Sequence, residues 1–319
     1  MMAAKVAISA TLTGLLVWRL ARLSGLPSGS GWTAFLLAWL VQALLPFLQV
    51  ERWRLVCTAA GIRLPFMVAT ENVYVGQFFN QVLPSSIGGD AVRVWRIRQA
   101  MPVEAALSTV LSDRIVALLA IPLILVGCSG TLLQIVPAGP LLYSLIAISV
   151  ASLGGLALLL VADRVPLPRK LRGAPVVKTL LELPAIARRL FLTPGYLAVT
   201  LLLSMLIHLG VGLSLFLLAK GLGLSVPLPI FVVLAPITTL VTMVPISVGG
   251  WGVREGVLVT ALGLLHVAPG DALSISIQFG IVMLIVGIPG GLVVFLRQWV
   301  KASPDRHHFR RPSAMPVTR

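Results

Sequence analysis

Long apolar runs separated by short polar segments are the dominant pattern along this chain. A helix rises about 1.5 Å per residue, so about 20 apolar residues cross the ~30 Å hydrocarbon core of a bilayer. Lipid cannot hydrogen-bond a bare peptide group, and the alternating strands of a barrel are absent, so we expect α-helices. Six full spans are predicted, at about residues 4–23, 32–50, 105–127, 141–161, 196–219 and 274–296.

Two further apolar segments, about 65–98 and 227–265, are interrupted by proline and glycine. Each is too broken for one clean span, and we interpret each as a re-entrant broken helix that enters and leaves on one side. The predicted fold is an all-α integral membrane protein. Its expected organisation is a first membrane repeat over residues 1–140, a second over 141–300, and a disordered basic tail over 301–319.

The two interruptions carry the same motif. The first reads PSSIGGDAVR from Pro84 to Arg93, and the second reads PISVGGWGVR from Pro245 to Arg254. Six of the ten positions are identical, at a constant offset of 161 residues, which indicates a duplication. Three full spans are predicted between the motifs, and because three is odd, the repeats are expected to point in opposite directions.

Inverted repeats with broken hydrophobic segments in matching places are typical of transporters whose site lies near the bilayer midplane. Proline removes an amide and the Gly-Gly pair lets the chain turn without Cβ clashes, so each segment is expected to break and expose backbone groups. Helix N-termini at such a break favour a phosphate or carboxylate. The alternative is that proline and glycine only allow close helix packing.

Composition and charge agree with a bilayer as solvent. The hydrophobic fraction is 58%, the charged fraction 11% and the mean hydropathy +1.00. A net charge of +15 would suggest nucleic acid in a soluble protein, but here most of the 25 lysines and arginines fall on one predicted side. The positive-inside rule then predicts an inner cell membrane protein with both termini in the cytoplasm and anionic lipid headgroups at that face. We expect no nucleic-acid partner. The exceptions to the bias are Arg19, Arg22, Arg114, Lys220 and Arg254.

Three local features leave alternatives open. Run 4–23 resembles a signal peptide, but Arg19 and Arg22 stand where a small-residue cleavage site belongs. The polar linker 163–193 is either an amphipathic helix lying on the membrane or a solvated loop. Cys57 and Cys128 are placed at opposite membrane faces, so we expect no bridge between them.

Charged residues at membrane depth are few, and they gather at the motifs. Ionisable groups there are costly and usually line a pathway, although structural ion pairs are the alternative. Asp113 and Arg114 are adjacent, about 100° apart on a helix, so each is expected to pair across helices. Asp90, Asp113 and Glu255 either relay protons or balance charge. The predicted substrate-binding and translocation residues are Asn80, Ser86, Gly88, Gly89, Asp90, Arg93, Asp113, Arg114, Ser247, Gly249, Gly250, Arg254 and Glu255.

The two motifs, the run from Gly76 to Arg93 and the triplet Ser112-Asp113-Arg114 resemble the lysylphosphatidylglycerol synthase transmembrane-region family, also called flippase-like. The resemblance covers about residues 10–300. It implies the membrane part of multiple peptide resistance factor, which flips aminoacylated phosphatidylglycerol outward. The bifunctional relatives carry a soluble aminoacyl-transferase domain after the membrane part. This sequence ends at Arg319 without one, so we do not expect it to synthesise that lipid, and its cargo need not be that lipid.

The leading hypothesis is therefore a non-enzymatic flippase whose cargo is an anionic or aminoacylated lipid. An intramembrane lipid-modifying enzyme is the first alternative. Against proteases, Asp90 lacks a Gly-x-Gly-Asp context, and neither Ser86 nor Ser247 has a Gly-x-Ser-Gly context. Lipid-linked glycosyl transfer has only Asp271 near an outer loop to support it. The second alternative is a non-transporting membrane subunit that scaffolds lipid enzymes. Whichever role holds, the partners considered are another copy of the chain and a lipid-biosynthetic enzyme. No cofactor is expected. No metal is expected either, because the four histidines lack ligand spacing: His208, His266, His307 and His308.

Overall fold

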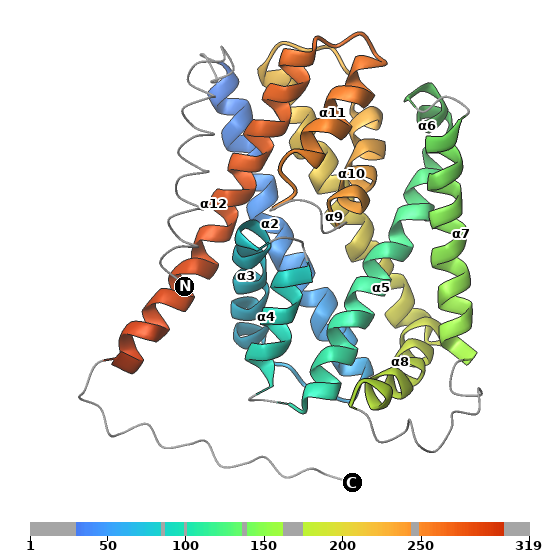
Figure 1. Ribbon diagram of the computed structural model, residues 1–319, viewed down its shortest axis with the longest axis vertical. Coiled ribbons are helices and arrows are strands. Elements are labelled where there is room, and N and C mark those ends of the chain that lie inside the picture. The colour runs from blue at the N-terminus through green and yellow to red at the C-terminus, as the bar shows by residue number, and fades with distance from the viewer. Residues whose placement is uncertain are drawn as a thin grey trace.

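The computed structural model describes residues 30–83, 87–98, 101–135, 139–161, 175–243 and 249–302 (Figure 1). This part of the chain is helical and contains no β-strand, which confirms the all-α prediction. Many helices begin at or just after a proline, whose fixed φ suits a first helical turn. The helices are α2 (Ser30–Ala59), α3 (Phe66–Val82), α4 (Ile87–Ile97), α5 (Val103–Gly127), α6 (Ser129–Ile135), α7 (Pro140–Val161), α8 (Pro175–Leu192), α9 (Pro194–Gly221), α10 (Leu228–Met243), α11 (Val253–Gly263) and α12 (Pro269–Ala302).

Four helices in the described ranges are long and apolar enough to cross a membrane, namely α2, α5, α9 and α12. They coincide with the predicted spans 32–50, 105–127, 196–219 and 274–296. Helix α2 runs on to Ala59, well beyond the predicted end of its span. Helix α7 covers the predicted run 141–161 but is not among these four. Run 4–23 and the tail from residue 303 lie outside the described residues.

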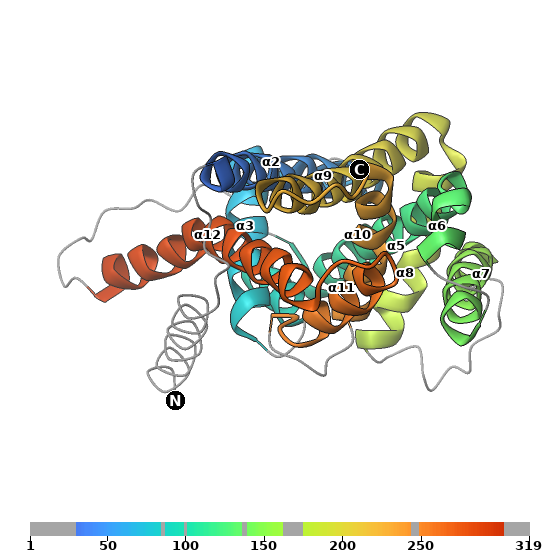
Figure 2. The same ribbon diagram turned by 90° about the horizontal axis from the view of Figure 1, so that it is seen from above.

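Helices α2 and α9 pack against each other and run antiparallel (Figures 1 and 2). Near one end Gly221 packs against Ala34. One turn further along α2, the carbonyl oxygen of Ala38 accepts a hydrogen bond of 3.2 Å from Ser214 Oγ. Small residues let the two backbones approach closely, because no hydrophobic force drives helices together in lipid.

Both interrupted segments fold as pairs of shorter helices. Helices α3 and α4 form the first hairpin, and α10 and α11 form the second. Figure 1 shows the first hairpin in the lower half of the molecule and the second in the upper half, with their joined ends near the middle of the longest axis. The predicted breaks are thus confirmed as breaks between helices, although residues 84–86 and 244–248 lie outside the described ranges.

The glycine pairs of the two motifs have different backbone roles. Gly249 and Gly250 have φ of 59° and 78°, so the second motif uses the left-handed region that glycine tolerates. Gly88 and Gly89 instead lie in the first turn of α4, and neither has a positive φ. The prediction that Gly-Gly makes the turn is therefore right for the second motif and wrong for the first. There the pair permits close packing, since a Cβ on Gly89 would overlap the carbonyl oxygen of Gly76.

The helices on either side of α7 and α8 recur in the same order. The start of α9 lies 164 residues after that of α2, and the start of α10 lies 162 after that of α3. The starts of α11 and α12 lie 166 residues after those of α4 and α5. These separations are close to the offset of 161 between the motifs. The order of these four helices and the separation of their starts therefore follow the offset between the motifs.

The basic linker contains helix α8, which settles the choice between helix and loop over residues 175–192. The apolar side chains near its C-terminal end are buried against other helices and do not face the membrane surface. Leu190 and Ile186 are buried in one cluster with Val56 of α2 and Val116 of α5. Both cysteines are free, as expected, with Cys57 in the last turn of α2 and Cys128 just after α5.

Candidate functional site

Five charged side chains from three helices meet beside the first hairpin. Helix α4 supplies Asp90 and Arg93, α5 supplies Asp113 and Arg114, and α2 supplies Arg52. We call this set the Arg93 cluster. Asp90 and Arg93 are three residues apart on one helix and therefore share a face. Asp113 and Arg114 point in different directions and pair with other helices, as their adjacency predicted.

The cluster is a chain of ion pairs. Arg52 Nε lies 2.8 Å from Asp113 Oδ1, and Arg93 Nη1 lies 3.6 Å from Asp113 Oδ2. Arg93 Nη1 also lies 3.2 Å from Asp90 Oδ1, while Arg114 Nε donates to Asp90 Oδ2. The structural ion pairs considered as an alternative are therefore present. Three arginines face two aspartates, so with all five groups ionised the cluster carries one net positive charge.

Arg93 is deeply buried and only partly satisfied. Its side chain is 8% exposed, and that of Arg52 is 7% exposed. The Arg93 guanidinium carbon lies 4.3 Å from the ring centroid of Trp53, close enough for a cation–π interaction. Yet Arg93 Nε and Nη2 have no hydrogen-bond partner among the described residues. Buried polar groups are nearly always paired, so these two donors call for an explanation.

Arg52 is the member of the cluster that sequence reasoning missed. It lies in the segment Glu51-Arg52-Trp53-Arg54, directly after the predicted end of a span at residue 50. Because α2 continues to Ala59, Arg52 lies two turns before the helix end, where it also donates to Ser204 Oγ of α9 over 3.1 Å. The mostly apolar run that follows, from Leu55 to Ala60, is the signal that would have placed it inside the helix.

Arg254 of the second hairpin has partners on both Nε and Nη2. Its Nε donates to Ser276 Oγ over 3.1 Å, and its Nη2 donates to Glu255 Oε1 over 3.0 Å. Ser276 in turn donates to the same Glu255 oxygen. The other oxygen of Glu255 accepts from the backbone N–H of Gly252 at the start of α11. One cation and one anion balance, so this site carries no net charge.

The two motif arginines share other features. Arg254 lies over the ring of Trp251, with 4.6 Å from its guanidinium carbon to the ring centroid, much as Arg93 lies over Trp53. Each also lies against a glycine of a neighbouring helix. A Cβ on Gly76 would come within 2.8 Å of Arg93 Cδ, and one on Gly280 would overlap the Arg254 guanidinium.

The joined ends of the two hairpins meet. A Cβ on Gly249 would lie 3.0 Å from the backbone oxygen of Gln81, which is in the last turn of α3. The structure therefore brings the first glycine of the second motif to the helix that precedes the first motif. Ser86 and Ser247, both predicted site residues, lie outside the described residues.

Asn80 caps helix α4, a role that was not predicted for it. Its Oδ1 accepts a hydrogen bond of 3.0 Å from the backbone N–H of Gly89. An amide oxygen here satisfies one of the free N–H groups in the first turn of α4. Asn80 therefore joins the two arms of the first hairpin.

Replacing Asn80 by alanine is expected to lower the free energy of unfolding by about 1 kcal/mol, because the N–H of Gly89 loses its acceptor. Thermal unfolding in detergent measures the change. Asn80→Asp is the matched control, since it keeps an acceptor oxygen at the positive end of α4 and should retain stability. Equal stability of the alanine variant and the wild type would contradict the capping role.

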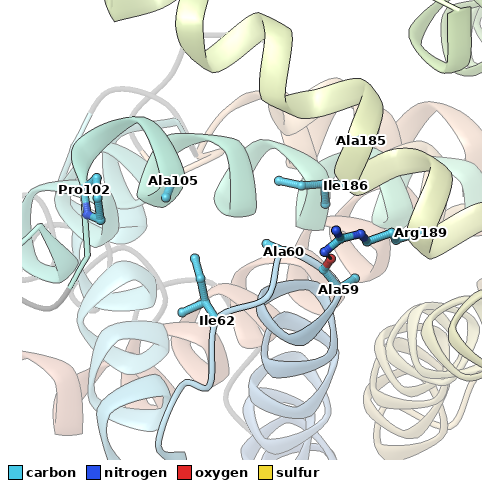
Figure 3. Close-up of a pocket in the computed structure, with 8 residues that line it drawn as sticks. All are labelled: Ala59, Ala60, Ile62, Pro102, Ala105, Ala185, Ile186 and Arg189. Carbon is cyan, nitrogen blue, oxygen red and sulfur yellow. Dashed lines mark hydrogen bonds between the residues drawn. The ribbon is translucent and has the colours of Figure 1, made fainter. Parts of the chain in front are cut away.

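A pocket of about 390 Å³ lies away from the motifs, where α2, α5 and α8 meet (Figure 3). Arg189 stands at its edge and donates through Nη1 to the carbonyl oxygen of Ala59 over 3.2 Å, near the end of α2. No member of the Arg93 cluster lines this pocket. Its lining residues are Ala59, Ala60, Ile62, Pro102, Ala105, Ala185, Ile186 and Arg189.

Metal ligands are not grouped in the part of the chain that the structure describes, where no three His, Cys, Asp or Glu side chains lie close enough to share an ion. The charged residues pair with one another instead. What the geometry offers chemically is two buried arginines at the hairpins. Arg254 is paired through Nε and Nη2, and in Arg93 the same two atoms are free.

Long apolar helices, two hairpins and a buried charge cluster define an integral membrane protein of the all-α class. Residues 2–291 match the model of the family described as lysylphosphatidylglycerol synthase TM region, and the chain belongs to that family. Neither a curated protein nor a solved structure matches this chain. The family is one of membrane proteins in lipid metabolism and transport.

Proposed function

We propose that this protein is a lipid flippase that moves an anionic or aminoacylated phospholipid, or a related lipid, between leaflets. The observation that carries the proposal is the Arg93 cluster, a buried set of charges with one net positive charge and two free donor atoms. Charge at membrane depth is costly and is usually retained where a charged group must pass. A phosphate diester headgroup supplies the missing negative charge.

The arrangement of the hairpins supports the same proposal. The two hairpins lie in opposite halves of the molecule, and their joined ends meet at Gln81 and Gly249 (Figure 1). Helix starts recur at separations close to that of the motifs, which is expected of a duplicated segment. In transporters built this way the substrate binds where the repeats meet. The headgroup path then passes between the two hairpins, beside Arg93.

The proposed orientation places the loops at the α8 end of the molecule in the cytoplasm. Arg63 lies in the connection from α2 to α3 and Arg98 directly after α4, and both are exposed. These connections and α8 lie at the same end of the molecule (Figure 1). Basic residues on one side favour the cytoplasmic face of a cell membrane and attract anionic lipid there.

The proposed role is transport without catalysis. Three buried carboxylates in or beside the hairpins are each paired with an arginine, namely Asp90, Asp113 and Glu255. A general base or nucleophile needs a carboxylate free to react, and none of these three is. We assign them to holding the arginines in place.

Proteoliposomes with fluorescent phospholipid test the proposal, because a membrane-impermeant reductant reports how fast labelled lipid reaches the outer leaflet. Arg93→Gln is expected to slow this movement about tenfold or more, since hydrogen bonds to a charged group contribute about 1.5–3 kcal/mol. Arg98→Gln is the matched control, because it removes the same charge from an exposed position just after α4. Equal rates for wild type and Arg93→Gln, with both proteins monodisperse before reconstitution, would overturn the proposal.

A further inference from the structure

The unpaired atoms of Arg93 form one edge of its guanidinium. Nε and Nη2 lie side by side with parallel N–H bonds, the fork that binds a carboxylate or a phosphate through two hydrogen bonds. Nη1, on the other side, lies near Asp90 and Asp113. The ion pairs therefore hold the side chain by one nitrogen and leave the bidentate edge free.

Arg254 has the same edge, and there it is occupied. Its Nε donates to Ser276 and its Nη2 donates to Glu255. The acceptors are a hydroxyl and a carboxylate oxygen at 3.1 and 3.0 Å, which are ordinary lengths for such bonds. The two hairpins thus differ in one respect that matters for binding: the second arginine carries its own internal anion, and the first does not.

The net charge of the Arg93 cluster would be balanced by an occupant with one negative charge. Three arginines and two aspartates leave an excess of one positive charge, and the Arg52 and Arg93 side chains are more than nine-tenths buried. An uncompensated charge at this depth is unfavourable, so an occupant with one negative charge is stabilised and one with a positive charge is rejected. Both free nitrogens are buried, so the groups that cover them have to move before an occupant can reach them.

Among the side chains that the structure describes, a cationic headgroup finds no unpaired carboxylate beside Arg93. Five of its carboxylates are paired with arginines: Glu51, Glu71, Asp90, Asp113 and Glu255. Glu104 and Asp271 lie in the first turns of α5 and α12, away from the joined ends of the two hairpins. An ammonium group carried into the membrane needs a carboxylate, and no unpaired one stands near Arg93.

We propose that the Nε–Nη2 edge of Arg93 binds the phosphate of a net-negative phospholipid headgroup, and that Arg52 sets this preference by neutralising Asp113. The inference rests on the proposed lipid transport and names its cargo class. It separates this protein from carriers of aminoacylated lipid, because a lysyl headgroup brings net positive charge. Arg52 is a positioning residue, since it contacts Asp113 and not the phosphate edge.

The experiment changes the net charge of the Arg93 cluster and measures which lipid the protein moves fastest. Wild type and variants are compared for movement of labelled phosphatidylglycerol, phosphatidylcholine and lysyl-phosphatidylglycerol, which carry net charges of about −1, 0 and +1. Arg52→Gln brings the cluster to zero, whereas Arg52→Gln with Asp113→Asn removes one charge of each sign and returns it to one positive charge. Arg54→Gln is the matched control, because Arg54 lies on the same helix but pairs with Glu51 outside the cluster.

Wild type and Arg54→Gln are expected to prefer phosphatidylglycerol over phosphatidylcholine about tenfold, with lysyl-phosphatidylglycerol slowest. Arg52→Gln should lose most of that preference, and the double variant should regain it. An unchanged preference in Arg52→Gln, or faster movement of the lysyl lipid in wild type, would overturn the inference.

A binding arm separates failure of the site from failure of transport. Thermal stabilisation of the detergent-solubilised protein is measured with each lipid and with inorganic phosphate. If wild type moves no lipid but still binds phosphatidylglycerol with a preference that Arg52→Gln removes, transport is wrong and the site stands. If phosphatidylglycerol and phosphatidylcholine stabilise equally, the site is wrong. If inorganic phosphate stabilises as well as the anionic lipid does, the ligand is free phosphate and the lipid assignment is wrong.

Discussion

Asp113→Asn is expected to lower the free energy of unfolding by about 3–5 kcal/mol, the usual cost of removing one partner from a buried ion pair. Asp113 is the carboxylate shared by Arg52 and Arg93, at 2.8 and 3.6 Å, and its side chain is only 4% exposed. Without it, two buried guanidinium groups lose their common counter-charge. Titration with a denaturing detergent, followed by circular dichroism, measures the change.

A second substitution shows whether charge balance is the cause. Arg52→Gln added to Asp113→Asn removes a matched pair of charges, so the double variant should recover most of the lost stability, a non-additive result expected of contacting residues. Asp271→Asn is the control, because Asp271 lies at the first turn of α12 and its loss should cost no more than about 1 kcal/mol. If Asp113→Asn alone unfolds at the wild-type midpoint, the ion pairs contribute nothing to stability.

Gly290→Leu is expected to disrupt the packing of α3 on α12 and to abolish lipid movement. Even a Cβ at Gly290 would overlap the backbone carbonyl of Tyr74, and backbone cannot rotate away as a flexible side chain can. Added methylenes in a packed interior typically lower the free energy of unfolding by about 1–3 kcal/mol. A leucine that meets backbone is expected to cost about 3 kcal/mol or more. Size-exclusion chromatography and thermal unfolding of the purified variant measure the effect.

Gly270→Ala is the matched control for this prediction. Gly270 lies in the same helix, and nothing stands within 4 Å of the position its Cβ would take. Removing glycine from a helix usually stabilises by about 0.5–1 kcal/mol, so this variant should be as stable as the wild type or more so. A well-folded Gly290→Leu protein would mean that α3 and α12 are free to separate.

The difference between the two hairpins bears on how a transporter with repeated halves works. Both arginines lie over a tryptophan and against a glycine, which reflects the shared motif. Only the second carries an internal carboxylate and hydroxyl on its bidentate edge. If phosphate is recognised at one hairpin only, the halves hold the headgroup unequally, and release does not have to overcome two strong sites.

Helix positions were largely predictable because they depend on local sequence. Hydrophobic runs of sufficient length placed α2, α5, α9 and α12, and the interruptions at the two motifs placed the breaks between the hairpin helices. The errors were also local. The sequence predicts that the span ends just before Arg52, because charged residues usually follow the end of a span. In the structure α2 continues, and pairing with the distant Asp113 keeps the Arg52 side chain buried. The same Gly-Gly pair turns the chain in one motif and packs helices in the other.

By itself the sequence determined that the chain is helical and membrane-embedded, and that one motif recurs at a fixed offset, because hydrophobicity and identity are properties of neighbouring residues. Only the tertiary structure decided which charges neutralise each other and which donors stay free. Arg52 and Asp113 are 61 residues apart, and Tyr74 meets Gly290 across most of the chain. Such pairings follow from how helices pack, so the open edge of Arg93 appears only once the helices are in place.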